Sequence, residues 1–175
     1  MKLFDNKYLK KRNLSMNPID IEKAYDLLVK QVDGLIDDSL PAISNLSNIS
    51  AAIKQTFDKI SWVGFYLLKD SHLYLGPFQG KVACTKINIG DGVCGKTFEL
   101  EETIIVPNVH KFPGHIACDV ETNSEIVIPI FNNDKTVGVL DLDSREFESF
   151  DESDKVWLEK IARIISTRLE LEKFF

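Results

Sequence analysis

The residues best suited to chemistry lie in one stretch, residues 112–144, which combines a thiol with several acids. Cys118 follows His115 by three residues in a polar loop. Two strand-like segments after it carry three carboxylates: Glu125, Asp141 and Asp143. A thiolate is a nucleophile, and a carboxylic acid that stays protonated near neutral pH can donate a proton to a departing oxygen. We therefore expect a reaction site here rather than a core.

The segments Glu125–Phe131 and Thr136–Asp143 predict a β-hairpin whose register decides where the acids lie. A three-residue loop over residues 133–135 places 132 opposite 136, Glu125 opposite Asp143, and Val127 opposite Asp141. A two-residue or four-residue loop would place Glu125 among the leucines, so the three-residue loop is the prediction. The three acids then share one face at one end of the hairpin. Because they cannot all ionise cheaply, at least one pKa should be raised.

The three cysteines, Cys84, Cys94 and Cys118, allow several interpretations. Any single cysteine is most often a buried inert thiol. Structural zinc is a second alternative, but the gaps of nine and twenty-three residues lack the close Cys-x-x-Cys pairing of such sites. The third is a nucleophilic thiolate with resolving thiols, which passes through sulfenic acid to a disulfide. Carboxylates nearby should raise the pKa of a thiol, so attack would need a cationic substrate or a protonated acid.

Residues 60–69 read as a strand rich in aromatic and β-branched side chains. Its period of two places Trp62 and Tyr66 on one face, with Val63, Phe65 and Leu67 on the other. Aromatic residues on a strand more often pack in the hydrophobic core than line a binding site. If they face the carboxylates, they form a box that suits a small apolar group or a cation.

The remaining pattern predicts the frame around these residues. Helices are expected from Asn17-Pro18 with Asn17 as cap, from near Pro41, after the turn at residues 90–92, and from a cap at Asp151. A returning strand over residues 72–80 is expected to be broken by Gly76-Pro77. This order predicts an α+β fold in which the terminal helices cover one face of an antiparallel sheet. Residues 84–124 would cover the other face.

Length and composition favour one domain over residues 17–175, preceded by a basic extension over residues 1–16. The formal charge of −6 argues against a general surface for nucleic acid or anionic membranes. No apolar run approaches the roughly 20 residues of a membrane span. Basic residues near the start are not followed by an apolar segment, which argues against a secretory signal. With an odd cysteine count, these features predict a cytoplasmic protein with reduced thiols.

Six segments in order carry a resemblance to a known family: VGFYLL, LGPFQGKVAC, IGDGVCG, HIACD, SEIVIPI and GVLDLDS. Together they resemble the free methionine-R-sulfoxide reductases built on a GAF domain, over roughly residues 18–170. The resemblance implies a GAF-like α+β fold, with a six-stranded antiparallel sheet, helices on both sides and an enclosed small pocket. It also implies a homodimer.

The resemblance further assigns roles by motif. Cys118 corresponds to the attacking thiol, Cys84 to the main resolving thiol and Cys94 to an auxiliary resolver. Trp62 and Tyr66 correspond to the wall around the substrate methyl end. The residues that correspond to the substrate-binding and oxygen-protonating acids are Glu125, Asp141 and Asp143. The implied cycle ends in an 84–118 disulfide that thioredoxin, with NADPH behind it, would reduce.

The implied reaction requires neither a metal nor an organic cofactor. A closed pocket that needs a free ammonium would exclude methionine sulfoxide inside a protein. Two rival functions remain at this point: a GAF module that senses a small molecule without chemistry, and a redox sensor that uses the same disulfide as a signal.

Overall fold

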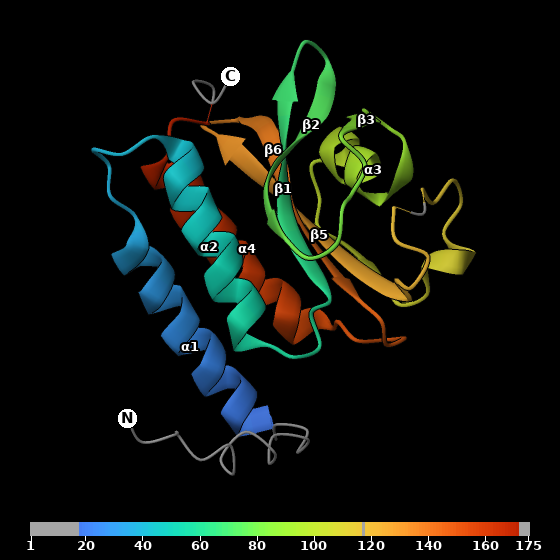
Figure 1. Ribbon diagram of the computed structural model, residues 1–175, viewed down its shortest axis with the longest axis horizontal. Helices are drawn as coiled ribbons and strands as arrows, with labels where there is room; N and C mark the ends of the chain where they lie inside the picture. The colour runs from blue at the N-terminus through green and yellow to red at the C-terminus, as the bar shows by residue number, and fades with distance from the viewer. Residues whose placement is uncertain (1–17, 117, 172–175) are drawn as a thin grey trace, which may run out of the picture.

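The computed structural model describes residues 18–116 and 118–171, which form an α+β fold (Figure 1). The extension predicted for residues 1–16 and the cap predicted at Asn17 lie outside the described residues. The elements are, in chain order, α1 (Pro18–Leu35), α2 (Ala42–Thr56), β1 (Trp62–Lys69), β2 (His72–Gln79), β3 (Lys86–Asn88), α3 (Gly92–Leu100), β4 (Ile104–Val106), the 3-10 helix Val109–Lys111, β5 (Ser124–Asn132), β6 (Lys135–Ser144) and α4 (Glu152–Arg168).

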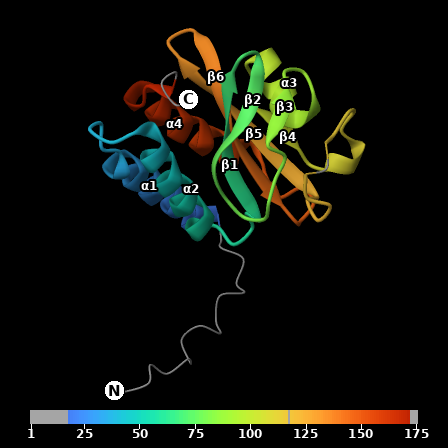
Figure 2. The same ribbon diagram turned by 45° about the horizontal axis from the view of Figure 1, so that its top comes forward.

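The strands form one antiparallel sheet in the order β3-β2-β1-β6-β5-β4. Helices α1, α2 and α4 lie on one side of it, and α3 lies on the other with the loops that follow it (Figures 1 and 2). Alternation along β1 explains the two layers. Val63, Phe65 and Leu67 pack in the core under α2 and α4, whereas Trp62 and Tyr66 pack in a second cluster on the α3 side. The predicted fold and the predicted faces of β1 are confirmed.

The β5–β6 hairpin has the predicted register at the acids but not at its turn. Glu125 pairs with Asp143 and Val127 with Asp141, as predicted. The loop, however, has two residues rather than three, because Asn132 pairs with Lys135. A β-bulge restores the register, since Ile130 pairs with Gly138 while the next residue pairs with Thr136. The prediction missed the one extra residue that a bulge inserts into a strand.

The break predicted at Gly76-Pro77 is also wrong. β2 runs without interruption from His72 to Gln79, and these two residues occupy a bulge opposite β1. Proline lacks an N–H and is tolerated within a sheet at such a bulge. The next strand after β2 spans only Lys86–Asn88. Cys84 therefore lies in the loop between β2 and β3.

The start of α4 is fixed by the predicted cap. Asp151 accepts hydrogen bonds from the backbone of Ser153 and Asp154, and the Asp154 side chain accepts one from the Asp151 N–H, which completes a capping box. Asp154 is buried and also accepts from Lys59 at 2.7 Å and from the Tyr25 hydroxyl at 2.5 Å. This carboxylate therefore ties α1 and the segment before β1 to the first turn of α4.

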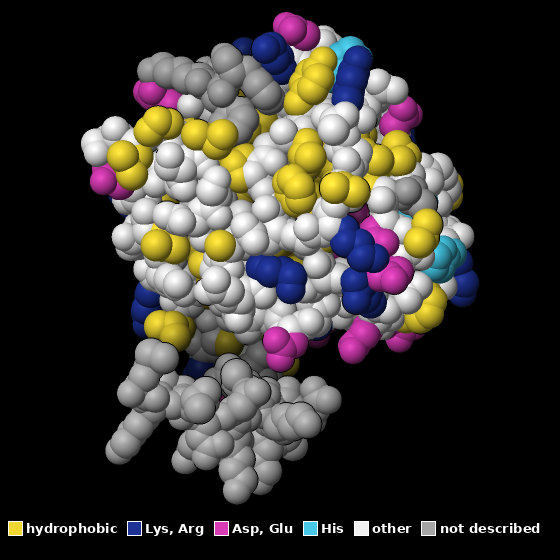
Figure 3. All heavy atoms as spheres, viewed as in Figure 1, with side chains coloured by type: hydrophobic (Ala, Val, Ile, Leu, Met, Phe, Trp, Pro, Cys, Tyr) yellow, Lys and Arg dark blue, Asp and Glu magenta, His cyan; other side chains and the backbone are white. Residues whose placement is uncertain are grey.

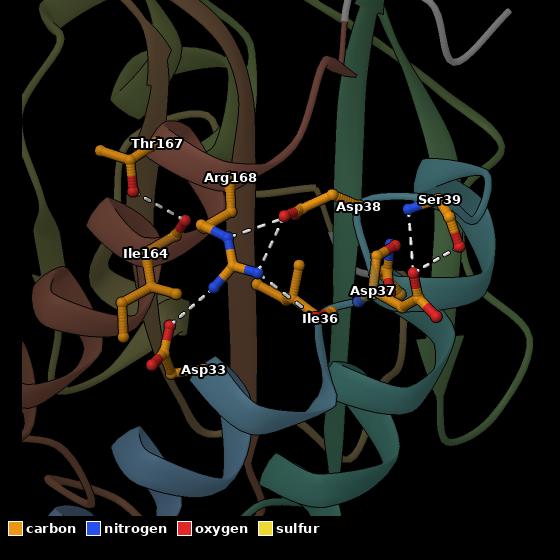
Figure 4. A network of polar contacts seen from close by, with 9 residues as sticks. Asp33, Ile36, Asp37, Asp38, Ser39, Ile164, Thr167 and Arg168 are labelled. Carbon is orange, nitrogen blue, oxygen red and sulfur yellow. Dashed lines mark hydrogen bonds and ion pairs between the residues drawn. The ribbon is translucent and has the colours of Figure 1, made fainter.

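At its other end α4 is held by Arg168 (Figure 4). The guanidinium contacts the Asp33 carboxylate of α1 at 3.0 Å and the Asp38 carboxylate of the next turn at 3.1 Å. On the face shown in Figure 3, acidic and basic side chains are mixed rather than gathered into one field. None of the helices in residues 18–116 and 118–171 is long and apolar enough to cross a membrane.

Candidate active site

A cavity lies between the sheet and the α3 side of the molecule, with about 530 Å³ of empty space including its open mouth. The side chains that line it come from β1, β3, α3, β5, β6 and the loops before β3, α3 and β5, and they include Val82. Those singled out by the sequence are Trp62, Tyr66, Cys94, Cys118, Glu125, Asp141 and Asp143. Cys84, the remaining candidate, is joined to Cys118 by a disulfide. The structure thus brings together all of the candidate site residues.

The acids are positioned by the centre of the sheet. Asp141 and Asp143 on β6 pair with Gly64 and Trp62 of β1 on one side, and β5 supplies Glu125 on the other. Glu125 and Asp141 are each 6% exposed, whereas Asp143 is partly exposed. Three carboxylates on one buried face are costly, because each charge loses solvation and repels the others.

Burial and this crowding raise the pKa of every acid in the group. Burial raises the pKa of Asp141 to about 7, although its hydrogen bond with Cys94 acts in the opposite direction. Burial, followed by the charges of Asp141 and Asp143, raises the pKa of Glu125 well above its usual range. Burial and the charge of Asp141 do the same for Asp143. The site therefore holds protonated carboxyl groups near neutral pH, with Asp141 the most easily ionised.

Cys94 faces these acids from α3 and takes no part in the disulfide. It is 4% exposed, and its thiol donates a hydrogen bond to Asp141 Oδ2 at 3.3 Å. Burial and the charges of Asp141 and Glu125 raise the pKa of this thiol. The other oxygen of Asp141, Oδ1, is buried and has no hydrogen-bond partner among the described residues. A buried acceptor of this kind suits a ligand that carries N–H or O–H groups.

Ligating atoms of Cys94, Glu125 and Asp141 lie within 4.8 Å of one another, so their spacing would admit a metal ion. A metal binds the thiolate and the carboxylate, so it would have to displace protons from groups whose pKa the burial raises. The donor set therefore fits a proton-handling site better than a resident metal centre.

The disulfide links two loops at the cavity mouth. Cys84 lies between β2 and β3, and Cys118 lies in the long segment between β4 and β5; their Cα atoms are 5.5 Å apart. Both cysteines are partly exposed. The two loops are also joined by Lys81, whose ammonium contacts Glu121 Oε2 at 2.6 Å and Asp119 Oδ1 at 3.4 Å. The pairing that the resemblance implied is thus present in the structure.

Two aromatic rings on β1 form a wall beside the acids, on the same face of the sheet. Trp62 and Tyr66 stack with their ring centroids 6.0 Å apart, and Phe78 stacks on the far side of Trp62 at 5.5 Å. The Trp62 indole N–H donates to the Lys81 carbonyl at 3.0 Å, and the Tyr66 hydroxyl donates to the Cys84 carbonyl at 3.0 Å. These bonds satisfy the polar atoms of both rings and attach the Cys84 loop to the wall.

Sequence reasoning missed several residues of the site. Thr122 is buried and its hydrogen bond lowers the pKa of Asp143, opposing the larger effect of burial. His115, which the sequence placed only near Cys118, lies 3.9 Å from Glu125 through Nδ1. Burial, followed by the nearby His110, lowers the pKa of His115, so its ring is neutral near pH 7. These residues lie in an irregular loop, where no regular period predicts which way a side chain points.

Comparisons with known proteins agree with this geometry. A family model described as GAF domain matches residues 46–170. The free methionine-R-sulfoxide reductase of Saccharomyces cerevisiae is 48% identical over 162 residues, which span 88% of this chain and 89% of that protein. The chain belongs to the GAF-domain family of free methionine-R-sulfoxide reductases.

Solved structures of this reductase family superpose closely on the chain. The fRMsr of Staphylococcus aureus in complex with substrate has a TM-score of 0.81 at 48% identity, covering 89% of this chain and 99% of that chain. The free methionine-R-sulfoxide reductase of Neisseria meningitidis in complex with its substrate has a TM-score of 0.83 at 38% identity, covering 92% and 96%.

Proposed function

We propose that this protein reduces free L-methionine-(R)-sulfoxide to methionine through a sulfenic acid on Cys118 and a disulfide with Cys84. The observation that carries the proposal is the position of this disulfide, at the mouth of a cavity lined by three carboxylates of raised pKa. A sulfoxide is reduced by a thiolate together with an acid, and these are the two kinds of group that the cavity contains.

Substrate binding follows from the charges and the aromatic wall. Asp141 is the acid of the three that ionises most easily, and its Oδ1 has no hydrogen-bond partner in the part of the chain that the structure describes. It is therefore suited to accept a hydrogen bond from the substrate ammonium. Trp62 and Tyr66 offer an apolar surface to the methyl end of the sulfoxide. A methionine sulfoxide inside a protein has no free ammonium. The proposed substrate is therefore the free amino acid.

In the first chemical step the Cys118 thiolate attacks the sulfoxide sulfur. Glu125 or Asp143, protonated because burial raises both pKa values, donates its proton to the sulfoxide oxygen. The oxygen passes to Cys118 as sulfenic acid, and methionine leaves with the electron pair on its sulfur. When these acids are protonated, the Cys118 thiolate does not experience the repulsion that three ionised carboxylates would exert.

In the second step the Cys84 sulfur attacks the sulfenic sulfur, the S–O bond breaks, and the hydroxyl group leaves as water with the proton of the Cys84 thiol as the disulfide forms. Thioredoxin, with its reductase and NADPH, is the proposed source of the two electrons that reopen the disulfide. Cys94 stays an auxiliary resolving thiol in this scheme, and the cytoplasm and a homodimer stay the expected location and assembly.

The proposal is tested by NADPH consumption with thioredoxin, thioredoxin reductase and separate diastereomers of methionine sulfoxide. We expect turnover with the free R form, little with the S form, and little with N-acetylmethionine-(R)-sulfoxide, which lacks the ammonium. A sensor without chemistry would give no turnover with any of them. Undiminished turnover in Cys118→Ser would contradict the mechanism.

A further inference from the structure

The two most exposed large apolar side chains among the described residues are Val82, which is 87% exposed, and Val120, which is 84% exposed. They belong to different loops. Val82 precedes Cys84 by two residues, and Val120 follows Cys118 by two residues. A single exposed apolar residue is ordinary on a protein surface. Here the two most exposed ones flank the same disulfide.

The contacts between the loops place these valines on one surface. The Cys84–Cys118 disulfide joins the loops at one point, and the contacts of Lys81 with Asp119 and Glu121 join them at another. Val82 lies in sequence between Lys81 and Cys84, and Val120 lies between Asp119 and Glu121. Both valines therefore lie beside the disulfide.

The charged groups at the edge of this surface largely neutralise one another. Glu121 contacts both Lys81 at 2.6 Å and Arg145 at 2.9 Å, and Asp119 contacts Lys81 at 3.4 Å. Two cations thus face two anions, which leaves little net charge to attract a partner. The exposed apolar area of the two valines is therefore the main feature of this surface that a partner could bind. A partner with apolar residues around its own reactive thiol would complement it.

We propose that Val82 and Val120 form the docking surface for the protein dithiol that reduces the Cys84–Cys118 disulfide. This inference rests on the proposed function, in which the disulfide is reopened in every cycle. A thiolate of the partner attacks one sulfur of the disulfide, the S–S bond breaks, and the other cysteine leaves as a thiolate that takes up a proton. The second thiolate of the partner then attacks the mixed disulfide. The partner departs oxidised, and two electrons have passed to this protein.

A comparison of two reductants separates docking from catalysis. Dithiothreitol reduces the disulfide without a docking surface, whereas thioredoxin must seat against the loops. We expect Val120→Asp to raise the KM for thioredoxin at least tenfold, with dithiothreitol-supported turnover within twofold of wild type. Val156→Asp, at a 51% exposed valine on α4, is the matched control and should resemble wild type with both reductants. An unchanged KM for thioredoxin in Val120→Asp, or an equal rise in Val156→Asp, would overturn the proposal.

A second variant covers the case in which the charge at position 120 disturbs the loop. If Val120→Asp also loses turnover with dithiothreitol, Val120→Ser is measured instead, and kcat/KM for thioredoxin is divided by that for dithiothreitol. A fall in this ratio supports docking at the valines, and an unchanged ratio contradicts it. Wild-type turnover with dithiothreitol but not with thioredoxin overturns the docking proposal and leaves the proposed function standing. Absence of turnover with both reductants overturns the proposed function as well.

Discussion

Glu125 and Asp143 are direct partners across the antiparallel pair of β5 and β6, so two carboxylates project from the same face of the sheet at the same level. Like charges in that position destabilise a sheet. Asp141, two residue pairs along the ladder and on the same face, adds a third carboxylate to the group. Burial and this repulsion keep the group partly protonated, which gives the cavity acids that act near neutral pH.

The first prediction concerns the proton donor. Asp143→Asn and Glu125→Gln keep the shape of each side chain but remove an acidic proton. We expect the variant that removes the proton donor to lower kcat about 100-fold, in the range typical of a lost general acid. Neither variant should lower the melting temperature, because each removes a repelled, buried carboxyl group. Turnover assays and thermal melts measure the two effects, with Asp134→Asn in the exposed hairpin turn as control. Wild-type activity in either variant would remove that residue from the mechanism.

The second prediction concerns stability and pH. The folded state raises the pKa of Asp141 from 3.8 to about 7, so between these values the folded protein binds more protons than the unfolded chain. The contribution of Asp141 to stability should therefore fall as pH rises from about 4 to about 7 and then level off. At about 1.4 kcal/mol per pKa unit, the shift from 3.8 to about 7 corresponds to a fall of roughly 4 kcal/mol from Asp141.

Urea titrations of the reduced protein at pH 5 and pH 8 measure this fall. Asp141→Asn should show a smaller difference between the two pH values, because it removes a carboxyl group that titrates in this range only when the protein is folded. Glu125 and Asp143 shift in the same direction, so part of the slope should remain. An equal slope in wild type and Asp141→Asn would show that Asp141 does not titrate in this range.

The third prediction tests whether Cys94 influences the pKa of Asp141. Its hydrogen bond to Asp141 lowers the pKa of that carboxyl, so Cys94→Ala should raise this pKa further, whereas Cys94→Ser keeps a donor. If ionised Asp141 binds the substrate ammonium, KM should fall as pH rises through about 7. We expect Cys94→Ala to move this transition upward, and we expect Cys94→Ser to leave it in place. A pH profile of KM that is equal in all three proteins would assign Cys94 no influence on Asp141.

The fourth prediction concerns the aromatic wall. A methyl group on Gly64 would collide with the Trp62 indole and with Phe78, so Gly64→Ala has no space in the present packing. We expect it to displace the indole, to raise the KM for the sulfoxide, and to cost about 1–3 kcal/mol of stability. Gly34 in α1 has nothing near its added methyl group, and Gly34→Ala should instead stabilise the protein by about 0.5–1 kcal/mol with unchanged KM. An unchanged KM in Gly64→Ala would show that the indole does not contact substrate.

The sequence predicted the regular parts of the site better than its loops. In the β5–β6 hairpin a period of two fixes which residues share a face, so the pairing of Glu125 with Asp143 could be predicted. The turn could not, because the bulge beside Ile130 adds one residue without changing the apolar pattern. The break predicted at Gly76-Pro77 was wrong for a similar reason, because glycine and proline occur both at bulges within a strand and at breaks between strands.

The loops that carry the cysteines offered no such pattern. The pairing of Cys84 with Cys118 came from the resemblance alone, because spacing did not distinguish it from a pair with Cys94. Contacts across the chain, such as those of Lys81 with Asp119, depend on how β2 and β5 bring distant loops together. No local feature of the sequence encodes them.

The most direct test of the mechanism is a single turnover without any reductant. Fully reduced protein is mixed with one equivalent of free methionine-(R)-sulfoxide, then quenched and analysed by peptide mass spectrometry. For the wild type we expect about one methionine per chain and an 84–118 disulfide. For Cys118→Ser we expect neither product. Methionine formed by Cys118→Ser, or methionine formed by wild type while Cys118 stays a free thiol, would contradict it.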